Sequence, residues 1–277
     1  MRIDSHQHFW RYNKEEFGWI CEGMEMIMKD QLPGHLSVEL NKSEFDGSIA
    51  VQARQSLAET DWLLKLADQY DFIKGVVGWV DLRSPALEKQ LEKYSKHPNF
   101  VGVRHVIQDE IADDFILEKK FTEGINLLKK FGLVYDILVL PRHLPNTIRF
   151  VEQFPDQTFV LDHMAKPYIR DRKLSPWKQD ILQLAKFPNV YCKASGMVTE
   201  NNWQRWKPDD FTPYLDTVFQ AFGAERMMIG SDWPVCRVVG EYPVIMNIVK
   251  DYLKNFTESE KVKVLGGNAV KVYKLKS

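Results

Sequence analysis

Two histidines stand two residues apart near the start of the chain, in the run Ile3-Asp4-Ser5-His6-Gln7-His8. In a β-strand successive side chains point to opposite faces, so His6 and His8 would share one face, about 7 Å apart. Two imidazoles on one face can close on one metal ion or on one substrate oxygen. The competing interpretation is a pair of polar residues in a turn, and the pair alone leaves both interpretations open.

Two residues that could complete such a site follow other apolar runs. Asp232 comes directly after Met227–Ser231, and His163 ends the run Thr158–His163. An aspartate that faces histidines can take a proton from water or ligate a metal ion. A helix N-cap is the competing interpretation for Asp232, and a structural pair with Asp162 is the one for His163. If all these runs end at one rim, we favour a general base or metal ligand for Asp232.

Five more residues lie at or just after the ends of predicted strands. Arg54 follows the second strand, Arg104 and His105 end the fourth, Lys166 follows the sixth and Trp233 follows the eighth. Because side chains alternate, only one of Arg104 and His105 can face inward. Lys166 could contact substrate or simply be exposed to solvent. Trp233 could contact substrate or simply pack within its loop.

These residues depend on a regular alternation of two kinds of segment. Short, near-continuous apolar runs are typical of strands buried on both faces of a parallel sheet, and apolar residues at spacings of three and four predict the helices between them. The predicted strands are Ile3–Phe9, Gly47–Ala53, Ile73–Val80, Phe100–Val106, Leu133–Leu140, Thr158–His163, Val190–Ala194 and Met227–Ser231. The predicted helices cover 56–69, 85–96, 122–131, 144–154, 177–185, 209–222, 242–253 and 258–273, with a further helical onset at 37–41.

Eight β/α units in one chain predict an α/β protein with a single (β/α)8 TIM barrel over residues 1–277. An open doubly wound sheet is the main alternative, but it requires a glycine-rich phosphate turn after the first strand, and the sequence has none there. In a barrel the chemistry lies at the C-terminal ends of the strands, which is where the residues above fall. The loop from Trp10 to about Leu36 is long enough to suggest a functional role.

The composition excludes several other classes. The 37 basic and 38 acidic residues give a net charge of −1, which favours neither a nucleic-acid nor a membrane partner and leaves a small-molecule substrate. Three scattered cysteines form no C-x-x-C pair and indicate a reducing cytoplasm. We expect neither a signal peptide nor a membrane span. The sequence does not give the oligomeric state.

Taken in order, the motifs resemble the amidohydrolase superfamily, of the amidohydrolase 2 type. They are most similar to its sugar-lactonase branch, the L-fuconolactonase and L-rhamnonolactonase group, to which the 2-pyrone-4,6-dicarboxylate lactonases are related. The resemblance runs from Asp4 to about Tyr273. Its motifs are Asp4-x-His6-x-His8, Gln52-Ala53-x-Gln55, Gly78-Trp79-Val80-Asp81-Leu82, Gly102-x-Arg104-His105, Leu161-Asp162-His163-x-Ala165-Lys166-Pro167, Ser195-Gly196 and Gly230-Ser231-Asp232-Trp233-Pro234.

The resemblance implies a barrel hydrolase whose centre is formed by His6, His8, His163 and Asp232. Relatives with two metals carry a bridging lysine or glutamate on the fourth strand and a histidine on the fifth, whereas this chain offers Arg104-His105 and Asp136. The resemblance therefore leaves two options. Either one divalent cation, zinc by preference, is held by His6, His8 and Asp232, or catalysis is metal-free and the histidines bind the substrate carbonyl.

The implied reaction is the opening of a sugar-acid lactone. Asp232 would activate water for attack on the ring carbonyl, and His163 would stabilise the oxyanion. His6, His8, Arg54, Arg104, His105, Lys166 and Trp233 are the predicted substrate contacts. The alternatives are a 2-pyrone-4,6-dicarboxylate-type lactonase, a decarboxylase of the same superfamily, and a barrel that binds a ligand without turnover. Which lactone fits is not given by the sequence.

Overall fold

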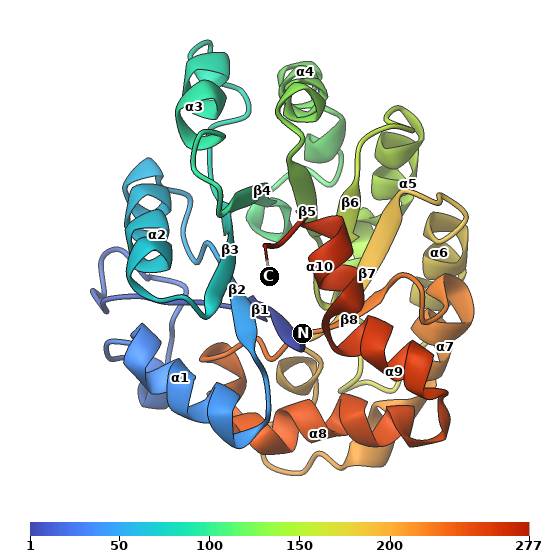
Figure 1. The fold of residues 1–277 in the computed structure, drawn as a ribbon. Coiled ribbons are helices and arrows are strands. Elements are labelled where there is room, and N and C mark those ends of the chain that lie inside the picture. The colour runs from blue at the N-terminus through green and yellow to red at the C-terminus, as the bar shows by residue number, and fades with distance from the viewer. Residues whose placement is uncertain (277) are drawn as a thin grey trace.

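Eight short apolar segments form a single parallel sheet in the computed structural model, which describes residues 1–276. The strands pair in sequence order, and a helix follows each of them on the outside (Figure 1). The strands are β1 Ile3–Gln7, β2 Gly47–Val51, β3 Ile73–Gly78, β4 Phe100–Val106, β5 Val134–Leu138, β6 Phe159–Leu161, β7 Val190–Ala194 and β8 Met227–Ile229. The helices are α1 Pro33–Lys42, α2 Leu57–Gln69, α3 Leu87–Tyr94, α4 Lys119–Leu128, α5 Leu144–Glu152, α6 Trp177–Leu184, α7 Thr212–Phe222, α8 Tyr242–Tyr252, α9 Glu258–Val262 and α10 Asn268–Val272.

The sheet closes between β1 and the segment just after β8. The amide of Asp232 donates to the carbonyl of His6 at 2.8 Å, and the amide of His8 donates to the carbonyl of Trp233 at 2.7 Å. The predicted (β/α)8 barrel is thus confirmed. Because these closing bonds involve His6, His8 and Asp232 themselves, the closure places the two histidines directly beside the aspartate.

The C-terminal segment covers the N-terminal end of the barrel. In Figure 1 α10 and the residues that follow it up to 276 lie over the middle of the strand ring. Val272, Tyr273 and Leu275 pack with the apolar side chains of the strands in one buried cluster. The opposite, C-terminal end of the strands is therefore the end that remains for a site.

Several helix boundaries differ from the prediction by a few residues, and two of the differences have a clear physical cause. The helix α1 begins at Pro33 rather than at Ser37, because proline at the first helical position suits a helix start. The helix predicted over 258–273 is interrupted at Lys263–Gly267. There a Cβ on Gly266 would lie 2.7 Å from the amide nitrogen of Ile3, so only glycine permits this close approach to β1.

The long segment between β1 and α1 is ordered by its own aromatic cluster. Trp10, Phe17, Ile20 and Ile27 are buried against one another, and the indole N–H of Trp10 donates to the carbonyl of Lys29 at 3.0 Å. The segment reaches over the C-terminal ends of the strands and contributes Trp19 and Met24 to the cavity described below. Among residues 1–276, no helix has the length and apolar character needed to cross a membrane.

Candidate active site

His6, His8 and Asp232 form a compact buried cluster at the C-terminal end of the barrel. The Nε2 atoms of His6 and His8 are 3.2 Å apart, and the Oδ1 atom of Asp232 lies 3.2 Å from His8 Nε2 and 3.8 Å from His6 Nε2. His8 Nδ1 lies 2.8 Å from the carbonyl of Val51, which can only accept, so this nitrogen carries the ring hydrogen. His8 therefore turns its Nε2 toward Asp232 and His6.

The donor set fits one divalent cation. Zinc bonds of about 2.0–2.1 Å in a tetrahedral site require ligand atoms about 3.3 Å apart. The three separations of 3.2, 3.2 and 3.8 Å are close to that value, and all three residues are buried. His6, His8 and Asp232 are thus the residues that would hold a cation, as the sequence predicted.

His163 enters the cluster from the turn after β6. Its Nε2 lies 3.9 Å from Asp232 Oδ1, and its Nδ1 lies 2.9 Å from the hydroxyl oxygen of Ser195. The turn from His163 to Lys166 has four consecutive residues with positive φ, a conformation that costs L-residues roughly 1–2 kcal/mol each. Asp232 also has a positive φ of 58°. Both side chains are therefore held by strained backbone, as is common where geometry is functional.

Two glycines leave space for the histidine rings. Gly196 has φ +62°, and a Cβ there would lie 2.7 Å from His163 Cγ. A Cβ on Gly230 would lie 2.8 Å from the Cβ of His6. Neither position can carry a side chain unless a cluster histidine moves.

Burial and neighbouring charges set the protonation of the cluster. Burial lowers the pKa of His163 to about 4 and holds that of His6 well below its usual value, so both rings are neutral near pH 7. Burial alone would raise the pKa of Asp232, but His163, His8 and His6 together bring it well below the usual value. The centre therefore holds one carboxylate beside the neutral rings of His6 and His163.

A second carboxylate stabilises the turn that carries Asp232. Asp4 accepts hydrogen bonds from the Ser231 amide at 2.9 Å, the Ser231 hydroxyl at 2.6 Å and the Tyr242 hydroxyl at 3.1 Å. Burial raises its pKa to about 6, although these donors oppose the shift. Asp4 thus ties β1 to the start of the Asp232 turn from outside the cavity.

Arg104 is the member of the Arg104-His105 pair that faces the centre. Its Nη1 lies 3.0 Å from Asp162 Oδ2 and 3.4 Å from His6 Nε2, and its Nη2 donates to the carbonyl of Gln52. His105 points to the other side of β4, where its ring stacks on Phe115 and its Nε2 lies 2.7 Å from Glu110. The prediction that His105 contacts substrate is therefore wrong, because strand alternation turns it toward the helices.

A cavity of about 580 Å³ opens over the cluster. Six predicted site residues line it, namely His8, Arg54, Arg104, His163, Lys166 and Asp232. His6 is fully buried behind His8 and reaches the centre only through Nε2. Trp233 is 1% exposed and packs on Phe9, so its predicted role as a substrate contact is wrong for the cavity as it stands.

The sequence analysis did not identify several residues of the cavity wall. Glu200 and Trp203 come from the loop after β7, and Gln55 follows β2. Lys166 Nζ lies 3.7 Å from Glu200 Oε1, and burial raises the pKa of that carboxyl while Lys166 opposes the shift. The length of the loop after β7 is the sequence feature that could have indicated Glu200 and Trp203. The pattern of strands and helices alone assigns this loop no role.

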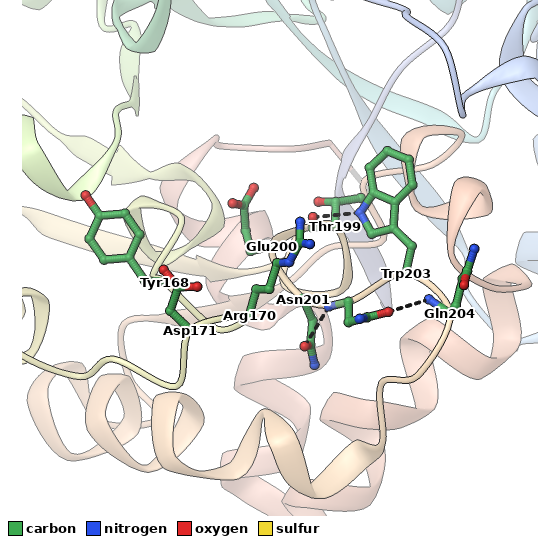
Figure 2. A pocket seen from close by; sticks show the side chains of 9 residues that line it. Tyr168, Arg170, Asp171, Thr199, Glu200, Asn201, Trp203 and Gln204 are labelled. Atoms are coloured by element: carbon green, nitrogen blue, oxygen red, sulfur yellow. Dashed lines mark hydrogen bonds between the residues drawn. The ribbon is translucent and has the colours of Figure 1, made fainter.

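A second hollow of about 650 Å³ lies beside the cavity. Figure 2 shows Tyr168 and Asp171 on one side of it and Thr199, Trp203 and Gln204 on the other, with Arg170, Glu200 and Asn201 between them. Thr199, Glu200 and Trp203 line both hollows. The indole N–H of Trp203 donates to the Thr199 carbonyl at 2.9 Å, which holds this dividing wall in place.

The fold and the cluster define a barrel hydrolase centre, and the comparisons with known proteins agree. The amidohydrolase family model matches residues 3–275, and the chain belongs to that family. An L-fucono-1,5-lactonase of Burkholderia multivorans is 38% identical over 99% of this chain and 96% of its own length. A second L-fucono-1,5-lactonase, from Burkholderia ambifaria, is 34% identical over the same shares of the two chains.

A solved amidohydrolase structure from Burkholderia multivorans with bound zinc superposes with a TM-score of 0.96. It is 37% identical and covers 100% of both chains. The predicted membership of the amidohydrolase superfamily is therefore confirmed, and so is the likeness to its sugar-lactonase branch. The protein is an enzyme of a hydrolase family and a homologue of lactonases.

Proposed function

We propose that this protein hydrolyses the lactone of a sugar acid, with L-fucono-1,5-lactone or a close aldonolactone as substrate. The full-length similarity to two L-fucono-1,5-lactonases supports the substrate class. The observation that carries the proposal is the cluster of His6, His8, His163 and Asp232 at the base of a 580 Å³ cavity. An ionised carboxylate to accept a proton from water, beside a neutral imidazole that can donate to the oxyanion, is what attack of water on a carbonyl requires.

The charge balance of the cavity favours a neutral substrate. Three cationic side chains line it, and each is already beside a carboxylate of the chain. Arg54 lies 2.6 Å from Glu16, and Arg104 lies 3.0 Å from Asp162. The third, Lys166, lies 3.7 Å from Glu200 in the wall of the cavity. A pyrone dicarboxylate would need cations free to pair with it, whereas the hydroxyls of a sugar lactone need hydrogen-bond donors and acceptors of both kinds.

The proposed mechanism assigns each cluster residue one task. The Asp232 carboxylate is ionised and accepts a proton from a water molecule that attacks the ring carbonyl. The ring of His163, neutral and placed opposite Asp232, donates a hydrogen bond to the carbonyl oxygen as negative charge develops on it. The ester C–O bond then breaks, and Asp232 returns its proton to the leaving ring oxygen.

A divalent cation held by His6, His8 and Asp232 would add Lewis-acid polarisation of the carbonyl. Independently of it, Arg104 and Lys166 offer N–H donors to the hydroxyls of the sugar ring. The aromatic face of Trp203 lies in the same wall. Trp19 and Met24 of the long segment between β1 and α1 also line the cavity and would limit the access of bulk water.

A substrate panel tests the proposal. The purified protein would be offered aldono-1,4- and 1,5-lactones of L-fuco, L-rhamno, D-galacto and D-glucono configuration, and acid release would be followed with a pH indicator, with and without chelator. We expect the highest kcat/KM on L-fucono-1,5-lactone or a lactone differing from it at one carbon. Turnover of 2-pyrone-4,6-dicarboxylate or of an aromatic acid, with every sugar lactone left intact, would overturn the proposal.

A further inference from the structure

An apolar patch of three side chains forms part of the wall of the cavity over the cluster. Met24, Ala53 and Val235 line this cavity, and all three also pack against the buried aromatic cluster of the long segment between β1 and α1. They come from three separate parts of the chain, namely that long segment, the loop after β2 and the loop after β8. The proposed mechanism gives this apolar patch no task.

The apolar patch is held in place by its surroundings. Met24 directly precedes the single-turn helix Glu25–Ile27, which contacts the single-turn helix Val235–Val238. The amide of Ala53 donates to Glu59 Oε2 at 3.1 Å, which fixes the start of the loop after β2. The side chains of the apolar patch offer hydrocarbon and thioether surface to a ligand, and none of them carries a strong hydrogen-bonding group.

Val235 is tied to the catalytic aspartate through the backbone. The amide of Cys236 donates to the carbonyl of Asp232 at 2.9 Å, so the turn that carries Asp232 and the helix that begins with Val235 form one unit. Both Asp232 and Val235 line the cavity. A substrate atom that reaches the Asp232 carboxylate therefore brings its neighbouring atoms to the side of the cavity where the apolar patch lies.

The chemistry of a 1,5-lactone decides which substrate atoms these are. The ring oxygen that leaves is bonded to C5, and C6 is bonded to C5 as well, so C6 is only two bonds from the leaving oxygen. Because Asp232 must return its proton to that oxygen, the C6 group lies on the Asp232 side of the cavity. A methyl group gains by leaving water for an apolar surface, whereas a hydroxyl group loses hydrogen bonds to water that the apolar patch does not replace.

We propose that Met24, Ala53 and Val235 are specificity-determining residues that receive the C6 methyl group of a 6-deoxy-aldono-1,5-lactone. The inference rests on the proposed function, since the position of C6 follows from the return of the proton by Asp232. The apolar patch selects against a lactone that carries a hydroxymethyl group at the same carbon. Apolar pockets distinguish substrates that differ by one such group by about 10–100-fold in kcat/KM, and we expect a preference of that size.

A matched pair of substrates tests the preference. L-fucono-1,5-lactone and L-galactono-1,5-lactone have the same configuration and differ only by the hydroxyl group on C6. Acid release from each would be followed with a pH indicator, and spontaneous hydrolysis would be subtracted. We expect the unmodified protein to favour the 6-deoxy lactone by about 10–100-fold in kcat/KM. Equal rates, or a preference for the 6-hydroxy lactone, would overturn the inference and leave the proposed function standing. If neither lactone is hydrolysed, the proposed function fails and the inference fails with it.

Val235→Thr links the preference to the apolar patch. Threonine has almost the shape of valine but places a hydroxyl group in the wall, where it can bond to the hydroxyl on C6. The ratio of the two kcat/KM values should fall by about two- to tenfold, which is the usual effect of one added hydrogen bond. Val238→Thr is the matched control, because Val238 lies in the same short helix and packs on the same aromatic cluster but does not line the cavity. It should leave the ratio unchanged.

Two further variants keep the inference testable if Val235→Thr does not fold. Met24→Gln introduces an amide at a similar side-chain length from a different segment, and it should lower the ratio in the same direction. Val106→Thr makes the same change as Val235→Thr at the end of β4, where another part of the cavity wall begins, and it should leave the ratio unchanged. A loss of stability or of rate that is common to both lactones cancels in the ratio. An unchanged ratio in Met24→Gln, or a fall in the ratio in Val106→Thr alone, would overturn the inference.

Discussion

A methyl group at position 196 tests whether His163 must stay where the structure places it. Gly196→Ala has two separate consequences. First, φ of +62° costs an alanine about 1–2 kcal/mol in the left-handed region. Second, the new Cβ would lie 2.7 Å from His163 Cγ, whereas carbon atoms pack at about 3.5–4.0 Å, so the imidazole must retreat by about 1 Å.

That retreat separates the ring from Ser195 and from Asp232. A displacement of about 1 Å in a catalytic group can cost about 100-fold in rate, so we expect kcat/KM on L-fucono-1,5-lactone to fall by that factor. Stability would be measured by urea unfolding, and the rate by acid release at a temperature where the protein is folded.

Gly132→Ala is the matched control. Gly132 also has a left-handed φ, of +66°, but the nearest atom to its added Cβ is the end of the exposed Lys274 side chain, with Nζ 3.4 Å away. Both variants should lose about 1–2 kcal/mol of stability from the backbone term, and only Gly196→Ala should lose activity. Parental kcat/KM in Gly196→Ala would refute the requirement for His163 in this position. An equal loss of rate in Gly132→Ala would trace the effect to stability.

Three other predictions use the same lactone assay. Because burial keeps the pKa of His163 at about 4, its ring stays neutral as the pH falls from 7.5 to about 5. We therefore expect log kcat/KM to be level over that range and to fall below pH 5, and an inflection near pH 6.5 would contradict the prediction. Arg104→Met should lower kcat/KM by at least about tenfold, because it removes a charged hydrogen-bond donor from the centre. His105→Gln should change kcat/KM by less than about twofold. Equal effects of the two substitutions would contradict the assigned orientations of the two side chains. Glu200→Gln should raise KM several-fold with little change in kcat if this carboxylate binds a sugar hydroxyl, and a loss confined to kcat would argue for a chemical role instead.

The barrel follows from local patterns that the sequence carries in full. Strands buried on both faces require continuous apolar runs, and β4 and β7 have the predicted bounds, Phe100–Val106 and Val190–Ala194. The break in the last helix could not be predicted in the same way. It depends on Gly266 lying against the backbone of Ile3, a contact between opposite ends of the chain that no local period records.

The candidate site also has a part that the sequence predicts and a part that it does not. The cluster of His6, His8, His163 and Asp232 was predictable because strand ends of a barrel converge at one rim. The inward-facing residues of a strand could not be predicted in the same way. Alternation requires that one of Arg104 and His105 faces inward, but it does not say which, and His105 faces outward. The burial of Trp233 arises from the bonds that close the barrel, which exist only once β1 and β8 meet.

The most direct measurement of the central claim is the rate of L-fucono-1,5-lactone hydrolysis by Asp232→Asn. Asparagine tolerates the left-handed backbone at this position, where φ is 58°, so the variant should fold. The surface variant Asp61→Asn, which loses only an exposed ion pair with Lys93, controls for the substitution itself. We predict a fall of about 10²–10⁴-fold in kcat for Asp232→Asn and a parental rate for Asp61→Asn. Parental activity in a folded Asp232→Asn protein would contradict the assignment of this cluster as the hydrolytic centre.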